Sequence, residues 1–295
     1  MAARIARSIT KSVLSKEQSE GDGARVFRSI GSYALRNLDP FLMLDEFDVR
    51  APAGFPDHPH RGFETVTYML EGEFLHEDFK GHKGRIGPGD LQWMSAGRGI
   101  VHSEIPANNK RNHGLQLWVN LASKDKMAEP NYQELPKEEV ARVSPEPGVD
   151  IKVIAGTSYG ATSPVVTRTP TMYIDVKLAK GKKIEQEIPE NYTGFIYTLA
   201  GSAKFGGQEH VSEAHHTLVL SNNLGTYVPV ESLSDDTHFV IIAGKPINEP
   251  IVQHGPFVMN TQQEIYQAFS DYQHGRNGFE GATEWTSTIR DKWRS

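Results

Sequence analysis

The sequence predicts an all-β protein made of two similar barrels, with a single helix near the C-terminus. Short segments rich in β-branched and aromatic residues recur along the chain between Gly, Pro and Asn, which is the pattern of strands joined by turns. A three-residue motif returns 129 residues later, and helical periodicity becomes clear only after residue 260. Many short strands with regular turn signals are typical of a sandwich or a barrel.

Six segments carry the strand signal most clearly, because each is short and is bounded by turn residues. They are ETVTYML (64–70), LQLWVNL (115–121), TMYIDVKL (171–178), GFIYTLAG (194–201), HTLVLS (216–221) and HFVIIAG (238–244).

The predicted helix is TQQEIYQAFSDYQ, residues 261–273. Thr261 and Glu264 have the spacing of a capping box, in which each side chain bonds to the other residue's backbone N–H. Apolar Ile265, Ala268 and Phe269 fall on one face. This pattern predicts a helix that packs on a barrel.

In the repeat, the spacing of Tyr68, Leu70 and Gly72 recurs at Tyr197, Leu199 and Gly201. Between the copies, PKEEVARVSPEPGVD (136–150) is rich in Pro and charge and resembles a linker. We therefore expect an N-terminal metal-binding barrel over residues 1–135, a linker over 136–150, and a C-terminal barrel with the helix over 151–295. The opening MAARIARSITKSVLSKEQ, which has no acidic residue before Glu17, is expected to be disordered.

Composition limits the partners. The net charge of −6 argues against direct nucleic-acid binding, which needs a concentrated basic face, and KRNH (110–113) is only a short basic turn. No apolar run approaches the ~20 residues that span a bilayer, so no membrane partner is expected. The chain has no cysteine, so a metal would need nitrogen and oxygen ligands. The absence of cysteine also fits a reducing compartment.

The segment FPDHPHRGFETVTYMLEGE (55–73) places two histidines two apart ahead of an alternating run. In a strand, His58 and His60 point to the same face, and the same parity would carry Glu64, Val66 and Tyr68 there. Pro59 lacks an N–H, which places the pair at a strand entrance or on an edge strand. A chain of this length with 12 histidines is expected to contain about 0.5 His-x-His pairs by chance, so this pair alone is weak evidence for a metal site.

A second pair, His102 and Glu104, lies in GRGIVHSEIP (97–106), and about one such pair is also expected by chance. If two strands bring both pairs together, three imidazoles and one carboxylate meet at one point. That set suits a first-row metal with about two positions left for water or substrate. The alternative is that all four are ordinary surface or strand-end residues.

The C-terminal half serves as a comparison. A shift of 129 residues places Glu187, Pro189, Glu231 and Leu233 at the positions of His58, His60, His102 and Glu104. No further HxH pair follows residue 60. We therefore expect no metal site in the C-terminal barrel, which would cover the first barrel or bind partners.

Several segments together resemble the pirin family of bicupins. They are FPDHPHRGFETVTYMLEGE, HEDFKGHKGRIGPGDLQWMSAGRGIVHSE, HGLQLWVNL and PIVQHGPFVMNT, and the likeness runs from about Ser12 to about Gly281. The resemblance implies two tandem cupin barrels (double-stranded β-helix, or jelly-roll) face to face, with one non-haem Fe²⁺ in the N-terminal barrel. It assigns the iron to His58, His60, His102 and Glu104. Glu64, where the general cupin pattern has a ligand, then becomes a hydrogen-bonded neighbour.

The resemblance also implies two functions. One is a quercetin 2,3-dioxygenase, an oxidoreductase that opens a flavonol-like small molecule with O2. The other is a non-catalytic, redox-sensing transcription co-regulator that binds Rel-type transcription factors or their IκB-like partners. A third hypothesis, besides these two functions, is that iron only stabilises the barrel. We expect a monomer located in the nucleus, the cytoplasm or both.

For the dioxygenase we expect Glu104 to be catalytic, as a ligand that also takes the substrate's hydroxyl proton. The remaining candidates have simpler readings. We expect His76 and His82 to be surface or hydrogen-bonding residues on a loop, and Trp93 and Trp118 to be core residues. Phe55 could wall the open positions or simply pack. Also outside the site we expect His113, His215, His216, His254 and the GRG of 97–99, which is too short for a phosphate loop.

Overall fold

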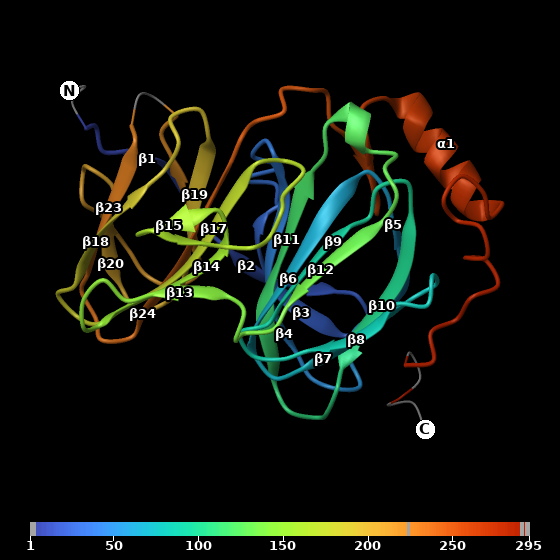
Figure 1. Cartoon of the computed structure of the whole chain (residues 1–295), viewed down its shortest axis with the longest axis horizontal. Helices are drawn as coiled ribbons and strands as arrows, with labels where there is room; N and C mark the ends of the chain where they lie inside the picture. Colours follow the sequence, from blue (N-terminus) through green and yellow to red (C-terminus); the bar gives the residue numbers. More distant parts are fainter. Residues whose placement is uncertain (1–3, 223–224, 290–291, 293–295) are drawn as a thin grey trace. The chain divides into compact units, whose positions relative to one another are not determined.

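The computed structural model describes residues 4–222, 225–289 and 292, which form strands and one α-helix (Figure 1). This confirms the predicted all-β fold with a C-terminal helix. The chain divides into two compact units, and each unit gathers separate stretches of sequence. We call them the first barrel and the second barrel. The first holds Glu17–Arg28, Phe41–Lys137 and Ile247–Ser295, and the second holds Met1–Lys16, Ser29–Pro40 and Glu138–Pro246.

The first barrel has a seven-stranded sheet in the order β12-β9-β6-β11-β4-β3-β2 and a four-stranded sheet in the order β5-β10-β7-β8. Figure 1 shows β6, β9 and β11 side by side. The elements are β2 Lys16–Glu20, β3 Ala24–Ile30, β4 Phe41–Val49, β5 Phe55–His60, β6 Phe63–Glu71, β7 Phe74–Asp78, β8 Lys83–Ile86, β9 Leu91–Ser95, β10 Ile100–Pro106, β11 Asn112–Asn120, the 3₁₀ turn η1 Ser123–Asp125, β12 Asn131–Leu135, β25 Val252–His254, β26 Phe257–Met259 and helix α1 Gln262–Gln273.

The second barrel has a seven-stranded sheet in the order β1-β22-β19-β24-β17-β14-β13, a four-stranded sheet in the order β18-β23-β20-β21, and the pair β15-β16. Its strands are β1 Ile9–Leu14, β13 Ala141–Val143, β14 Val149–Ala155, β15 Thr157–Ser158, β16 Ala161–Thr162, β17 Thr171–Leu178, β18 Lys183–Glu187, β19 Thr193–Ala200, β20 Ala203–Phe205, β21 His210–Ser212, β22 His216–Leu220, β23 Tyr227–Ser232 and β24 Thr237–Gly244.

The sequence repeat reflects a structural repeat. The orders of the two large sheets match strand for strand, as do those of the two small sheets. Tyr68 lies on β6 and Tyr197 on β19, at the same place in each order, and both side chains are fully buried. The predicted pair of similar barrels is therefore confirmed, and the six predicted strands agree with β6, β11, β17, β19, β22 and β24 to within three residues.

The two ends of the chain each join the barrel that lies farther away in sequence. In the large sheet of the first barrel, β12 is the edge strand next to β9. In the large sheet of the second barrel, β1 takes the equivalent edge position and pairs antiparallel with β22. The expectation that the opening residues are disordered is therefore wrong for residues 9–14 and 16–18, which lie in β1 and β2, while residues 1–3 lie outside the described residues. The expected linker, 136–150, contains β13 and the start of β14. The boundaries of the domains at 135 and 150 stay predictions.

Helix α1 belongs to the first barrel. Its capping box is as predicted, since the Glu264 N–H donates to Thr261 Oγ1 (3.2 Å) and the Thr261 N–H donates to Glu264 Oε2 (2.8 Å). Ile265 and Ala268 are buried against Phe257. In the described part of the chain, no helix has the length and apolar character needed to cross a membrane.

Candidate metal centre

Three histidines converge inside the first barrel. His58 and His60 lie on β5, and His102 lies on β10, directly opposite His58 in the antiparallel register. Opposite residues share one face of a sheet, so the imidazoles point the same way. One ring nitrogen from each lies within 4.8 Å of the others, and His102 Nε2 is 3.0 Å from His58 Nε2. β5 is the edge strand of its sheet, as the N–H missing at Pro59 predicts.

The imidazoles are set up to offer lone pairs. His58 Nδ1 donates to the Pro56 carbonyl (2.8 Å), which leaves Nε2 free to act as a ligand. Burial lowers the pKa of His60 well below its ordinary value, and neighbouring His58 lowers it further. Burial has the same effect on the pKa of His102. Both histidines are therefore neutral at physiological pH.

His60 gives the clearest indication that this centre can bind a metal ion. Its side chain is 2% exposed, and among the described residues neither ring nitrogen has a hydrogen-bond partner. His102 Nδ1 also lacks one. Leaving a buried polar nitrogen unpaired costs about 1–3 kcal/mol, and a metal ion would satisfy one of the two nitrogens of His60. The residues present therefore fit a bound metal ion.

Glu104 lies on β10, two residues after His102, with Oε2 4.0 Å from His102 Nε2. The Thr67 hydroxyl donates to its Oε1 (3.0 Å) and the Gln116 amide donates to its Oε2 (3.2 Å). These bonds hold the carboxylate beside the histidines. Three imidazoles and one carboxylate form a nitrogen and oxygen ligand set that suits a divalent first-row metal.

The sequence analysis did not identify Thr67 and Gln116 as neighbours of Glu104. The two residues lie opposite each other on the paired strands β6 and β11. The parity argument had placed Glu64, Val66 and Tyr68 beside the histidines. It was wrong, because the chain passes from the small sheet to the large one at residues 61–62, and alternation does not continue across that step. Instead, Thr67 bonds Glu104.

Glu64 lies on the opposite face of β6 from Thr67. Its Oε2 accepts from the indole N–H of Trp93 (3.0 Å), which makes it a hydrogen-bonded carboxylate as expected. Trp93 is fully buried, again as expected. Glu64 and Trp93 thus stabilise the sheet without facing the histidines.

Aromatic rings border the histidines. Trp118 is partly buried and lies edge-on to His60, with 5.2 Å between ring centroids, and it also packs on Phe63 at 4.4 Å. It was expected to be a core residue, but its ring borders the centre. Phe55 packs against Phe47 and Phe74, which agrees with the simple packing reading.

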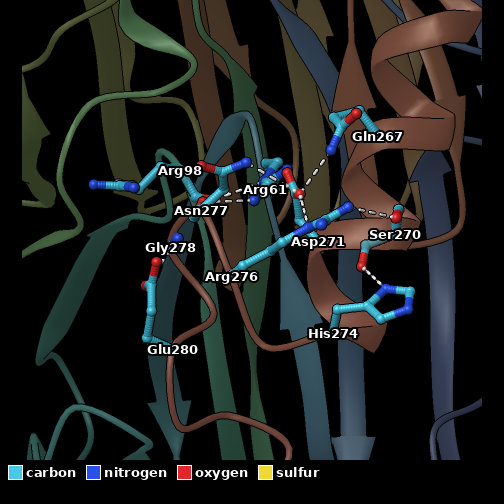
Figure 2. Close-up of polar contacts among 10 residues, drawn as sticks. All are labelled: Arg61, Arg98, Gln267, Ser270, Asp271, His274, Arg276, Asn277, Gly278 and Glu280. Carbon is cyan, nitrogen blue, oxygen red and sulfur yellow. Dashed lines mark hydrogen bonds and ion pairs between the residues drawn. The ribbon is translucent and has the colours of Figure 1, made fainter.

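The residue after His60 ties this segment to the C-terminal helix (Figure 2). Arg61 forms a buried ion pair with Asp271 of α1, with Nη1 2.9 Å from Oδ2. Its other nitrogens donate to the carbonyls of Arg98 (2.6 Å) and Asn277 (2.7 Å). The C-terminal segment thus holds the end of β5 in place.

Gly62 makes the close turn between the two sheets possible. Its φ is +90°, and a Cβ there would lie 2.0 Å from the Val258 carbonyl oxygen, so no other residue fits. Buried Lys126 donates to the Gly62 carbonyl from Nζ (2.8 Å), and also to Asn120 Oδ1 and the Val258 carbonyl. The turn after His60 is therefore rigidly held.

Histidines outside the centre have other partners. His113 Nε2 is 2.7 Å from Glu46 Oε1, His216 Nδ1 is 3.0 Å from the Ala214 carbonyl, and His254 packs edge-on against Phe269. The expectation of a surface loop was wrong for His76, which lies on β7 and is buried. His76 and His82 meet Glu134 in a separate cluster.

In the second barrel, the strands equivalent to β5 and β10 are β18 and β23. Ile184, Val228 and Val230 on these strands are buried in its apolar core. Of the positions found by the sequence shift, Glu187 is exposed and Glu231 pairs with Lys183 at 3.3 Å. Ile184, Val228 and Val230 thus fill the second barrel with apolar side chains on the strands equivalent to those that carry the imidazoles in the first barrel.

Comparison with known proteins agrees with this architecture. The family model "Pirin" matches residues 23–119, and "Pirin C-terminal cupin domain" matches residues 173–278. A pirin-like protein of Solanum lycopersicum is 57% identical, covering 95% of this chain and 96% of its own length. Pirin of Homo sapiens is 56% identical, covering 96% and 98%. A crystal structure of quercetin 2,3-dioxygenase from Acinetobacter baumannii has a TM-score of 0.85 and 33% identity, covering 92% of this chain and 99% of that chain.

Proposed function

Because the chain belongs to the pirin family, we propose that it is an iron-dependent oxygenase of the quercetin 2,3-dioxygenase type, which opens the heterocycle of flavonols with O2. The observation that carries the proposal is the meeting of three imidazoles, with Glu104 Oε2 4.0 Å from His102 Nε2 and the buried nitrogens of His60 unpaired. The similarity to the Acinetobacter baumannii enzyme supports the substrate class.

His58, His60, His102 and Glu104 would hold the iron. A first-row metal held by four protein ligands would still have room to bind a small molecule. When bound, ferrous iron supplies Lewis acidity and redox capacity to the site. Burial keeps His60 and His102 neutral, so they need no deprotonation at physiological pH to act as ligands.

Glu104 is the proposed catalytic residue. The enzyme must remove the proton of the flavonol's 3-hydroxyl group, and a carboxylate beside the substrate is suited to that task. Thr67 and Gln116 aim the carboxylate through their hydrogen bonds. The partly buried ring of Trp118 offers an aromatic surface against which a flat substrate can lie.

The test combines metal analysis of natively purified protein with O2 uptake on quercetin. We expect about one iron per chain at the centre, and turnover that disappears in His60→Ala together with the iron. Glu104→Gln should lower turnover by at least 100-fold while weakening iron binding much less. His113→Ala, which removes a histidine bonded to Glu46 outside the centre, serves as the control and should keep both. Iron-loaded wild-type protein that leaves quercetin unchanged would end the dioxygenase proposal.

The regulatory reading is the alternative proposal, with action in the nucleus or the cytoplasm. His58 is only half-buried, so the centre comes close to the surface on that side. A change between ferrous and ferric iron alters the charge there by one unit, and a transcription-factor partner needs a coupling of only ~1–3 kcal/mol to sense it. Equal affinities of a Rel-type partner for the ferrous and ferric protein would exclude this switch.

A further inference from the structure

A second cluster of metal-ligating side chains lies in the first barrel. His76 comes from β7, His82 from the turn before β8, and Glu134 from β12. One ligand atom from each lies within 4.8 Å of the other two. Glu134 Oε1 is 2.8 Å from His76 Nε2 and 3.0 Å from His82 Nε2. None of these residues belongs to the set His58, His60, His102 and Glu104.

His76 is the unsatisfied member of this cluster. Its side chain is 2% exposed, and its 2.8 Å contact with Glu134 lacks the geometry of a hydrogen bond. Within the described residues, Nε2 therefore has no hydrogen-bond partner. Such a nitrogen, buried and close to a carboxylate, is placed where it could act as a metal ligand.

Gly84 on β8 leaves the space that this nitrogen needs. A Cβ at Gly84 would lie 2.2 Å from His76 Nε2 and 3.3 Å from Glu134 Oε1. Gly84 is not among the described residues with positive φ, so its backbone does not demand glycine. The missing side chain therefore serves to keep room around the ligand atoms.

Glu134 is charged and the cluster reaches solvent. Burial alone would raise the pKa of Glu134, but its contacts with His76, Gln92 and His82 outweigh burial and lower the pKa to about 2. About one third of the His82 and Glu134 side chains is exposed, which gives an ion a path from the surface. Tyr132 stacks on His82 with 4.1 Å between ring centroids and fixes its orientation.

The distances are slightly shorter than those around a tetrahedral ion. With metal–ligand bonds of about 2.0–2.1 Å, neighbouring ligand atoms lie roughly 3.3 Å apart. The two nitrogen–oxygen distances here are 2.8 and 3.0 Å, so a small outward movement is enough to admit an ion. We propose that His76, His82 and Glu134 form a second metal site that binds Zn²⁺, with water as the fourth ligand.

The experiment titrates metal-free full-length protein with Zn²⁺ and counts bound equivalents by calorimetry. Zinc also suits the ligands of the first centre, so single variants separate the two sites. Wild type should bind two equivalents, His82→Ala one and His60→Ala one. His82→Ala should fold, because the side chain is partly exposed and the backbone N–H of residue 82 keeps its bond to Asp78. His113→Ala is the matched control, a histidine bonded to a single carboxylate, and should bind two.

Crystals soaked in Zn²⁺ give an independent readout that needs no variant. Anomalous density at the zinc edge should appear between His76, His82 and Glu134. Absence of that density, or equal stoichiometry in wild type and His82→Ala, would overturn the second site. If His60→Ala matched wild type while His82→Ala lost one equivalent, the second site would stand and the first centre would fail instead.

Discussion

Replacing Asp271 with alanine tests how the C-terminal helix supports the first barrel. The carboxylate accepts from Arg61 (2.9 Å), and also from Gln267 (2.7 Å) and Asn277 (3.1 Å) (Figure 2). The side chains of Arg61 and Asp271 are 2% and 1% exposed. Alanine would leave the guanidinium buried without its counter-charge. Removing one partner of a buried pair costs about 3–5 kcal/mol, so we expect a loss of this size in the free energy of unfolding.

Urea unfolding followed by tryptophan fluorescence measures this loss. The described tryptophans, Trp93, Trp118 and Trp285, all belong to the first barrel, so the signal reports on that unit. Glu129→Ala is the control, because it removes a carboxylate that pairs with Arg98 at 2.8 Å but is 77% exposed. Exposed pairs contribute about 0–1 kcal/mol. A loss in Asp271→Ala no larger than that of the control would refute the reasoning.

Three further predictions follow from single contacts. Burial lowers the pKa of Lys126 to about 8 from 10.5, so between pH 8 and pH 10.5 the unfolded chain binds more protons than the folded chain. The free energy of unfolding should therefore rise with pH in this range, by about 3 kcal/mol at most. Urea unfolding at several pH values should show this rise in the wild type and not in Lys126→Met. Thr261→Ala removes the capping hydrogen bond of α1 and should cost about 1 kcal/mol in the same assay, whereas no loss would mean that packing alone holds the helix. Gln116→Ala removes a donor to Glu104 and should weaken metal binding by roughly 10- to 100-fold with little change in unfolding; unchanged affinity would contradict the orienting role.

Six of the strands and the helix could be predicted because their signals are local. Segments such as 171–178 carry β-branched residues between turn residues, and their side chains fill the barrel core. The capping box of Thr261 and Glu264 is also local, and the structure has it as predicted. The repeat of Tyr68 at Tyr197 indicated two similar units because the same strand position must bury the same ring.

Other features left no local signal. β1 is mostly exposed and shows no apolar alternation, so only its pairing with β22 makes it a strand. The sequence around Lys126 gives no sign that this lysine is buried, yet its Nζ donates to three oxygen acceptors inside the barrel. His76 reads as a loop residue, yet β7 pairs with β10 and turns the side chain inward.

By itself, the sequence determined where six of the strands and the helix lie, which donor atoms are present, and that a metal would need nitrogen and oxygen ligands. The tertiary structure alone decided which donors meet: Thr67 and Gln116 at Glu104, Glu134 between His76 and His82, and Arg61 at Asp271. The physical reason is that alternation along one strand sets only the face of a side chain. Its neighbours across the barrel depend on the register between strands that lie far apart in the chain.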